Sequence, residues 1–120
     1  MKKFMLGLSL VVSMVSAPLS ALAGVQDFKL INKTGWAVEK VYVEASNADE
    51  WGEDVLGEGI LATGRSKEIH FTGYDENTCK FDIRVEDVRG KAWEITGVDL
   101  CETSNVTIRM RAGKLVYTEE

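Results

Sequence analysis

Apolar and polar residues alternate along most of the chain after residue 24, in short runs separated by clusters of turn-forming residues such as glycine, asparagine and aspartate. Such alternation predicts half-buried β-strands, and no stretch keeps the period of an amphipathic helix. The runs cover residues 26–32, 36–44, 60–62, 67–72, 81–86, 93–100, 106–110 and 115–118. We therefore expect an all-β fold, a single antiparallel β-sandwich or small barrel of about seven or eight short strands.

One of these runs changes phase in its middle. Trp36 and Val38 share one phase, whereas Val41 and Val43 share the other. A β-bulge between the two pairs would bring all four side chains to one face, because a bulge adds one residue to a strand. The turn-forming segment 32–35 before this run predicts that the first two strands form a hairpin.

Residues 1–23 have the three parts of a secretory signal peptide. A cationic start with two lysines precedes an uncharged apolar run over residues 4–15. Small residues stand at both positions that a signal peptidase reads in Ala21-Leu22-Ala23, so we expect cleavage after Ala23. A membrane-spanning helix is the alternative, but it needs about 20 apolar residues, and Pro18 interrupts the run. We therefore expect one all-β domain over residues 24–120, in a protein that is periplasmic or secreted.

The stretch from Cys79 to Cys101 holds the two cysteines of the chain, one at each end. Two strand-like runs lie between them, and the turn at 88–91 lies midway, so equal arms would bring the cysteines together. Two cysteines in an exported chain favour one disulfide. Zinc, which usually takes four ligands, and a free thiol are the competing alternatives. Gly97 interrupts the second arm and predicts a second bulge.

The chain carries 14 basic and 19 acidic residues, a formal charge of −5, which becomes −7 without the two lysines of the signal peptide. Because like charges repel, an acidic domain is not expected to bind nucleic acid or anionic lipid. It would attract cations, either a cationic partner protein or metal ions. The alternative is that the charge only keeps a small exported protein soluble.

The acidic loop, residues 46–59, is the longest stretch without strand character. It carries five carboxylates and no basic residue: Asp49, Glu50, Glu53, Asp54 and Glu58. Calcium binds about six to eight oxygen atoms, so Asp49, Asp54 and Glu58 are candidate calcium ligands. The spacing does not form an EF-hand, because Trp51 takes a ligand position and strands flank the loop. The other explanation is a solvated loop that its apolar residues hold to the sandwich, with a single helical turn near its start.

The three tryptophans mark the places where large apolar contacts are expected. Trp93 shares the inward phase of its strand and is expected in the core. Trp36 follows a turn and would cover one end of a sheet. Trp51 lies in a glycine-flanked loop and is the one of the three that we expect to be partly exposed. An exposed aromatic side chain in an acidic loop is a candidate contact for a protein partner, with packing against the domain as the alternative.

Residues suited to catalysis are scarce. His70 is the only histidine, and strand alternation turns it away from Ile69 and Phe71, toward solvent. A hydrolytic triad requires a histidine held by an acid beside a nucleophile, and the pattern provides neither. Gly57 and Gly59 lack the third glycine and the following helix of a nucleotide-binding loop. We therefore expect no catalytic residue, no cofactor-binding residue and no enzymatic activity.

Four motifs follow one another along the mature chain. They are Phe28-x-Leu30-x-Asn32-x-Thr34-Gly35-Trp36, Trp51-Gly52-x-Asp54-x-Leu56-Gly57, Cys79-Lys80-Phe81-Asp82-Ile83-Arg84-Val85 and Val98-Asp99-Leu100-Cys101. In order and spacing they resemble a small family of exported bacterial β-domain proteins of unknown function. The resemblance implies a compact β domain and no established activity, so it assigns no catalytic residue. It makes Trp51, Asp54, Cys79, Asp82 and Cys101 the first positions to test.

These features predict an exported, non-enzymatic binding or structural module with an unknown protein partner, which the charge of the domain suggests is cationic. Two alternatives stay open. One is a β-module stabilised by calcium at Asp49, Asp54 and Glu58, and the other is an acidic inhibitor of a cationic enzyme such as lysozyme. No nucleic-acid partner, no cofactor other than calcium and no membrane span in the mature chain are expected.

Overall fold

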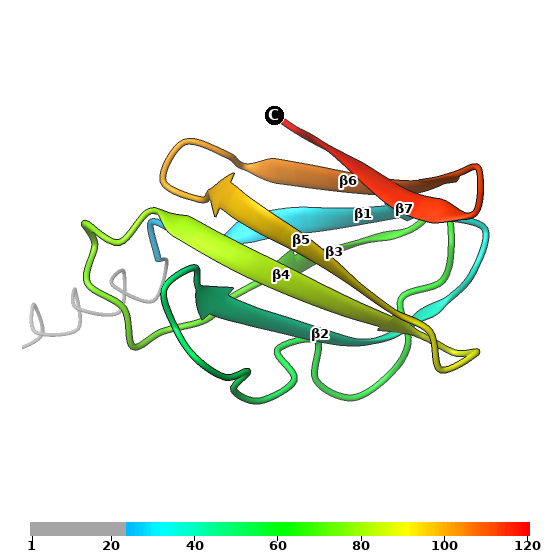
Figure 1. The fold of residues 1–120 in the computed structure, drawn as a ribbon, viewed down its shortest axis with the longest axis horizontal. Helices are drawn as coiled ribbons and strands as arrows, with labels where there is room; N and C mark the ends of the chain where they lie inside the picture. Colours follow the sequence, from blue (N-terminus) through cyan, green and yellow to red (C-terminus); the bar gives the residue numbers. More distant parts are fainter. Residues whose placement is uncertain (1–23) are drawn as a thin grey trace, which may run out of the picture.

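The computed structural model describes residues 24–120 (Figure 1), and the predicted signal peptide lies outside the described residues. The strands are β1 (Phe28–Lys33), β2 (Val38–Ala45), β3 (Ser66–Ile69), β4 (Lys80–Asp87), β5 (Ala92–Asp99), β6 (Asn105–Arg111) and β7 (Lys114–Glu119). No helix occurs in residues 24–120, and so none there is long and apolar enough to cross a membrane.

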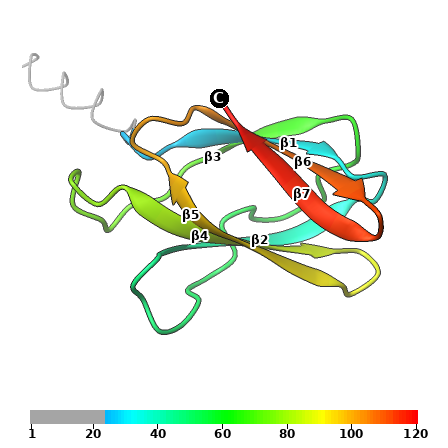
Figure 2. The same cartoon turned by 45° about the horizontal axis from the view of Figure 1, so that its top comes forward.

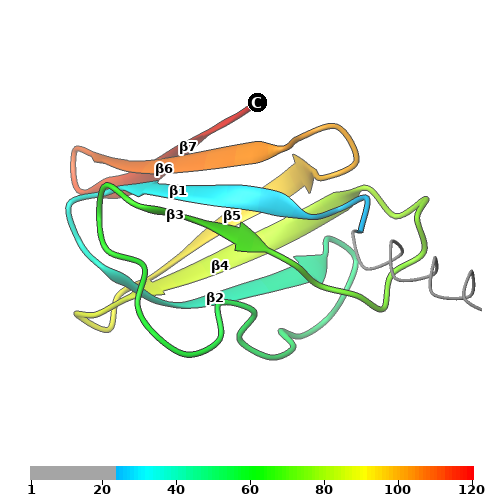
Figure 3. The ribbon, with the colours of Figure 1, turned by 180° about the vertical axis from the view of Figure 1, so that it is seen from behind.

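The seven strands form two sheets that face each other. One sheet has four strands in the order β3-β1-β6-β7, and the other has three in the order β2-β4-β5. Figure 2 shows the two layers tilted from the view of Figure 1, and Figure 3 shows them from behind. The arrangement confirms the all-β prediction and identifies the fold as a sandwich, whose interior is filled by alternating residues of both sheets. The side chains fully buried there include Phe28, Leu30, Val41, Phe81, Ile83, Val85, Val106 and Ile108.

The predicted hairpin between the first two strands is wrong. β1 pairs with β3 and β6, whereas β2 pairs with β4 in the opposite sheet. The turn-forming residues after β1 carry the chain from one sheet to the other, so that Leu30 and Val41 face the same core from opposite sides. The β1–β6 pair is also parallel, with Leu30 opposite Val106, while the other strand pairs are antiparallel as expected.

Both predicted bulges are present. The register between β2 and β4 shifts between Val38 and Lys40, which brings Val38 and Val41 to the same buried face. The register between β4 and β5 shifts where Phe81 pairs with Val98, because β5 contains one extra residue next to Gly97. Gly97 has a φ of 69°, a left-handed conformation that glycine adopts without a steric penalty.

Three other local predictions need correction. The expected strand at 60–62 is a single bridge between Leu61 and Val38, and the expected helical turn near the start of the acidic loop is a hydrogen-bonded turn at residues 46–47. Trp93 is half-buried rather than part of the core. Its strand β5 is at the edge of its sheet, so Trp93 has a strand neighbour only on the β4 side, where Val85 lies opposite.

A disulfide joins Cys79 and Cys101, as predicted, with a Cα–Cα distance of 5.1 Å. The hairpin between them turns after Asp87, and β5 begins at Ala92. The backbone N–H of Leu100 donates to the carbonyl of Cys79, so the pairing of the two arms continues to the disulfide. The disulfide therefore links β4 and β5 of the three-stranded sheet at the end opposite to the hairpin turn.

Candidate functional site

A groove of about 520 Å³ opens between the acidic loop and the segment that follows β3. The end of β2 supplies one side of it through Val43 and Glu44. Residues 52–55 of the acidic loop form a second side, and residues 70–74 form a third. Segments distant in sequence therefore build the groove, with carboxylates from β2 and the loop and aromatic rings from the segment after β3.

Asp54, one of the predicted calcium ligands, fixes the shape of the acidic loop. Its Oδ1 atom accepts hydrogen bonds from the backbone N–H groups of Val41 and Leu56, each at 2.9 Å. The N–H of Val55 donates to the carbonyl of Val41 at 2.7 Å, and the side chain of Leu56 is buried in the core. Hydrogen bonds therefore attach the centre of the loop to β2, and the buried side chain of Leu56 adds the apolar packing that the sequence suggested.

Glu44 is the carboxylate at the junction of these elements. The hydroxyl of Tyr74 donates to Glu44 Oε1 at 3.0 Å. Burial, together with the hydrogen bond to Glu44 and its negative charge, raises the pKa of Tyr74 above its ordinary value of 10.0, so the hydroxyl stays a donor at neutral pH. A Cβ atom on Gly52 would lie 2.7 Å from Glu44 Oε2, so only glycine at this position leaves the carboxylate where it is.

Three aromatic rings support the apolar wall of the groove. Phe71, Tyr74 and Phe81 pack edge-to-face on one another, with ring centroids 5.1 to 5.8 Å apart. Phe81 is fully buried, so Phe71 and Tyr74, which pack on it, are anchored in the core. Such rigid packing holds Tyr74 in position to bond Glu44.

A second, smaller hollow of about 180 Å³ lies beside the groove. Glu44 lines both, and the other residues of this hollow are Ala45, Ala48, Asp49, Glu50, Trp51, Asp82 and Glu94. Asp82 accepts hydrogen bonds from the Ser46 hydroxyl and the Gly97 N–H, and Glu94 pairs with Arg84. Trp51 is half-buried against this acidic lining, so part of its side chain is exposed.

The described part of the chain offers the groove carboxylates no internal cation. None of the ion pairs formed by residues 24–120 includes Glu44, Asp49, Glu50, Glu53, Asp54 or Glu58. A carboxylate without an internal cation keeps its full charge for a ligand. The groove therefore carries negative charge that no ion pair within residues 24–120 compensates, and in the hollow beside it Glu94 is the carboxylate with a cationic partner.

The three predicted calcium ligands are not brought together. Asp54 lines the groove, Asp49 lines the smaller hollow, and Glu58 lines neither. In residues 24–120, the one set of three potential ligands that lie close together is Cys79, Asp99 and Cys101. Its two sulfurs are joined in the disulfide, so this set is not a thiolate metal site.

His70 lies at the rim of the groove and faces solvent, as its strand phase predicted. Its Nδ1 atom is 2.8 Å from Asp27 Oδ2, a partner that the sequence did not reveal. The antiparallel register of β1 and β3 explains the pair, because Phe28 lies opposite Ile69 and the preceding and following residues are then neighbours. In residues 24–120, His70 makes no hydrogen bond to a serine, threonine or cysteine side chain.

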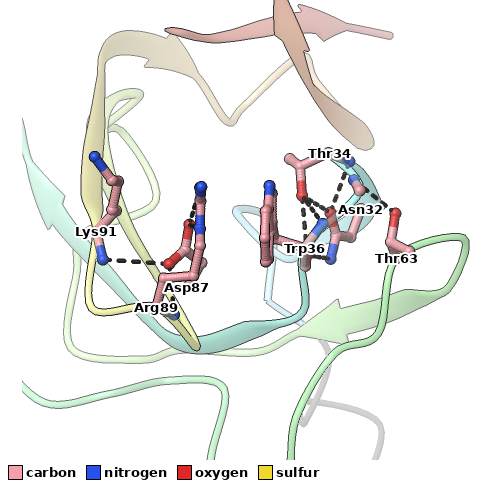
Figure 4. Close-up of polar contacts among 8 residues, drawn as sticks. Asn32, Thr34, Trp36, Thr63, Asp87, Arg89 and Lys91 are labelled. Atoms are coloured by element: carbon pink, nitrogen blue, oxygen red, sulfur yellow. Dashed lines mark hydrogen bonds and ion pairs between the residues drawn. The ribbon is translucent and has the colours of Figure 1, made fainter. Parts of the chain in front are cut away.

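The most exposed tryptophan is Trp36, not Trp51, and it lies in a loop that hydrogen bonds fix from within (Figure 4). Asn32 is fully buried and donates from Nδ2 to the carbonyls of Trp36 and Leu61. Its Oδ1 atom accepts from the N–H and the hydroxyl of Thr34. The Thr63 hydroxyl accepts from the N–H of Gly35. An asparagine two residues before a threonine is the sequence signal that could have indicated this turn.

Arg89 covers one face of the Trp36 indole. Its guanidinium carbon lies 3.9 Å from the ring centroid, and its Nη2 atom lies 2.7 Å from Asp87 Oδ2. Burial of Asp87 opposes its ionisation, but hydrogen bonds from Arg89 and Lys91 and the charge of Arg89 outweigh burial and hold the pKa of Asp87 below its ordinary 3.8. Asp87 therefore stays ionised and fixes Arg89 against the indole.

Comparison with known proteins adds support for the fold. No protein-family model matches the chain, and no curated protein matches it either. One solved structure, the NMR structure of a protein from Eubacterium rectale, is similar with a TM-score of 0.54 and 16% sequence identity. The similarity covers 78% of this chain and 85% of that chain. At this identity the likeness concerns the fold alone.

Proposed function

We propose that this protein is an exported binding module, without catalytic activity of its own, that takes a basic segment of a partner protein into the acidic groove. The observation that carries the proposal is the pairing of carboxylates without an internal cation, Glu44 and Glu53, with the aromatic wall of Phe71 and Tyr74. The predicted signal peptide supports export, and the disulfide is compatible with an oxidising compartment.

The chemistry of the groove favours a lysine or arginine side chain. Both have an apolar stem that can lie along aromatic rings and a cationic head that can reach a carboxylate. Glu44 is held by Tyr74, so it needs little reordering to meet a cation. A groove of about 520 Å³ accommodates one or two such side chains but not a folded domain. The partner would therefore present an exposed basic loop or terminus.

Isothermal titration calorimetry of residues 24–120 with short lysine- and arginine-containing peptides, and with the same peptides carrying glutamine instead, tests the proposal. Binding should require the cation and weaken as salt is raised. The double variant Glu44→Gln/Glu53→Gln should lose at least about tenfold in affinity, corresponding to about 1.4 kcal/mol. The matched control Glu68→Gln/Glu102→Gln removes the same charge from exposed positions outside the groove and should bind normally.

A cationic enzyme is a special case of such a partner, and lysozyme is the first to test. Bound through a basic loop, the module would act as an inhibitor only where that loop borders the active site of the enzyme. Lysozyme activity should then fall with added protein and recover with the Glu44→Gln/Glu53→Gln variant. Equal binding of cationic and glutamine peptides by the unmodified protein would overturn the proposal as a whole.

A further inference from the structure

Three loops at one end of the sandwich present exposed apolar side chains. Trp36, Ile60 and Val88 are 43%, 58% and 45% exposed. The loops meet there, since the N–H of Val88 donates to the carbonyl of Ala37, and Leu61, which follows Ile60, bridges to Val38. We call this surface the tryptophan end; it is the end with the β4–β5 turn in Figure 1.

Basic residues surround these apolar side chains. The β1 and β6 strands run in parallel and finish at this end, and the β6–β7 turn lies there too. Exposed cations on these segments and on the neighbouring loops are Lys33, Arg65, Lys91, Arg111 and Lys114. The carboxylates nearby are Asp87, which Arg89 neutralises, Glu86, which pairs with Arg84, and the exposed Glu39 and Glu58. The tryptophan end therefore carries a positive balance in an acidic protein.

The negative charge gathers elsewhere. Besides the acidic groove, carboxylates cluster near the disulfide and at the C-terminal end of β7: Asp75, Glu76, Asp99, Glu102, Glu119 and Glu120. An eight-residue strand such as β4 spans roughly 26 Å, whereas fields are screened over about 8 Å at physiological salt. A surface that approaches the tryptophan end therefore meets its local charge, not the net charge of the domain.

We propose that the tryptophan end docks on an anionic lipid surface. Tryptophan favours the boundary between headgroups and acyl chains, where its ring is partly apolar and its N–H can stay solvated. Lysine and arginine around it attract anionic headgroups. The Trp36 loop is already fixed by Asn32 and Thr34, so docking does not have to order it. Because the tryptophan end is basic and the groove is acidic, an anionic lipid surface attracts the tryptophan end and repels the groove.

This proposal does not depend on ligand binding in the acidic groove. It differs from the expectation, drawn from net charge alone, that the domain avoids anionic lipid, because it rests on the local charge of one end of the domain. A domain attached in this way would leave its groove accessible on the side away from the bilayer.

Flotation of residues 24–120 with lipid vesicles tests the proposal. Vesicles that contain phosphatidylglycerol should bind the protein, vesicles of phosphatidylcholine alone should not, and high salt should release it. The triple variant Lys33→Gln/Lys91→Gln/Lys114→Gln should lose roughly a hundredfold in partitioning, because each basic residue near an anionic leaflet contributes about 1 kcal/mol and about 1.4 kcal/mol is tenfold. The control Lys29→Gln/Lys67→Gln/Lys80→Gln removes the same charge from other surfaces and should partition nearly as the unmodified protein does.

Quenching by brominated lipid identifies the surface that inserts. Tryptophan emission should be quenched in the unmodified protein and largely spared in Trp36→Phe, which retains Trp51 and Trp93. The proposal would be overturned if the control triple variant lost as much vesicle binding as Lys33→Gln/Lys91→Gln/Lys114→Gln does. Quenching that persists in Trp36→Phe would overturn it too. So would sedimentation showing self-association without vesicles that the Lys33→Gln/Lys91→Gln/Lys114→Gln variant abolishes, because the tryptophan end would then bind the acidic surface of a second copy.

Discussion

The loop around Trp36 and the acidic loop at 46–59 both carry a tryptophan next to a glycine, yet the fold holds them by different means. A buried side chain, Asn32, holds the first loop with three hydrogen bonds to Thr34 and Trp36, and a fourth bond joins it to Leu61. A half-buried carboxylate, Asp54, holds the second loop at its centre, beside the backbone bond of Val55 and the buried side chain of Leu56. The first loop presents its tryptophan on a fixed base, and the second leaves room for a groove.

The difference shows that exposure and rigidity are set separately. Trp36 is the more exposed of the two rings although its loop is the more tightly bonded. A fixed, exposed ring loses little entropy on binding, whereas a groove with uncompensated carboxylates gains from a ligand of opposite charge. The two regions are thus suited to different partners.

Removal of the Asn32 side-chain amide should have the largest effect on stability, because this amide holds the Trp36 loop and has no counterpart in the acidic loop. Asn32→Ala leaves the buried carbonyl of Leu61 and the N–H of Thr34 without their partner, and leaves the Trp36 carbonyl with the Thr34 hydroxyl as its remaining donor. Each unsatisfied buried group costs about 1–3 kcal/mol, so we expect a loss of about 3–5 kcal/mol in the free energy of unfolding by urea. Thr63→Ala removes one exposed bond to the same loop and should cost less than about 1 kcal/mol. Similar losses in both variants would refute this account of the loop.

Loss of the disulfide should destabilise mainly the end of the sandwich opposite to the tryptophan end. The bridge spans 22 positions, and closing such a loop stabilises a domain by about 3 kcal/mol in the chain-entropy description. Reduction, or Cys79→Ser, should lower the unfolding free energy by that amount and speed amide exchange near residues 79 and 101 before it does so in the Trp36 loop. The double variant Cys79→Ser/Cys101→Ser should be insensitive to reductant. An unchanged melting curve for the reduced protein would contradict the prediction.

The carboxylate that shapes the groove should have a smaller effect. Asp54→Ala removes the shared acceptor for the N–H groups of Val41 and Leu56 and should cost about 2 kcal/mol. Glu53→Ala, an exposed neighbour, should stay within about 0.5 kcal/mol of the unmodified protein. Urea denaturation measures both, and hydrogen exchange should show faster exchange at Val41 only in Asp54→Ala. Equal stability of the two variants would mean that Asp54 does not hold the loop.

The smallest expected effect is a dependence on pH at the tryptophan end. The pKa of Asp87 is lowered in the folded state, so its ionised form contributes stability above the unfolded pKa of about 4. That contribution is lost as the pH falls through the lower, folded pKa. The stability difference between the unmodified protein and Asp87→Asn should therefore shrink below about pH 4. Chemical denaturation at several pH values measures it, and a difference independent of pH would rule out this role of Asp87.

Local periodicity was sufficient for much of the fold. Alternation over 81–86 and 106–110 predicted strands that the structure confirms, and the two phase breaks predicted both bulges. Cys79 and Cys101 lie at equal distances on either side of one turn, and this spacing predicted the disulfide. These features depend on neighbours a few residues apart or on one hairpin, and such information is present in a short window of sequence.

Long-range partners were not predictable in this way. A turn after β1 indicates that the chain changes direction, but not that it enters another sheet, so the β1–β2 hairpin was wrong. The groove depends on Tyr74 meeting Glu44, and the exposure of Trp36 depends on the burial of Asn32 under a distant loop. Trp51 was expected to be partly exposed because glycine flanks its loop, but nothing in the local sequence indicated that Trp36 would be the more exposed ring.

The parallel pairing of β1 and β6 also sets the order in which the protein can assemble during its synthesis. β1 leaves the ribosome first among the strands, while its neighbour β6 is made almost last. The central pair of the four-stranded sheet therefore cannot form on a growing chain, whereas β4 and β5 can pair as soon as both exist. Contacts of such long range form slowly. The polypeptide would thus remain open until synthesis is nearly complete, which would suit the export in unfolded form that we propose.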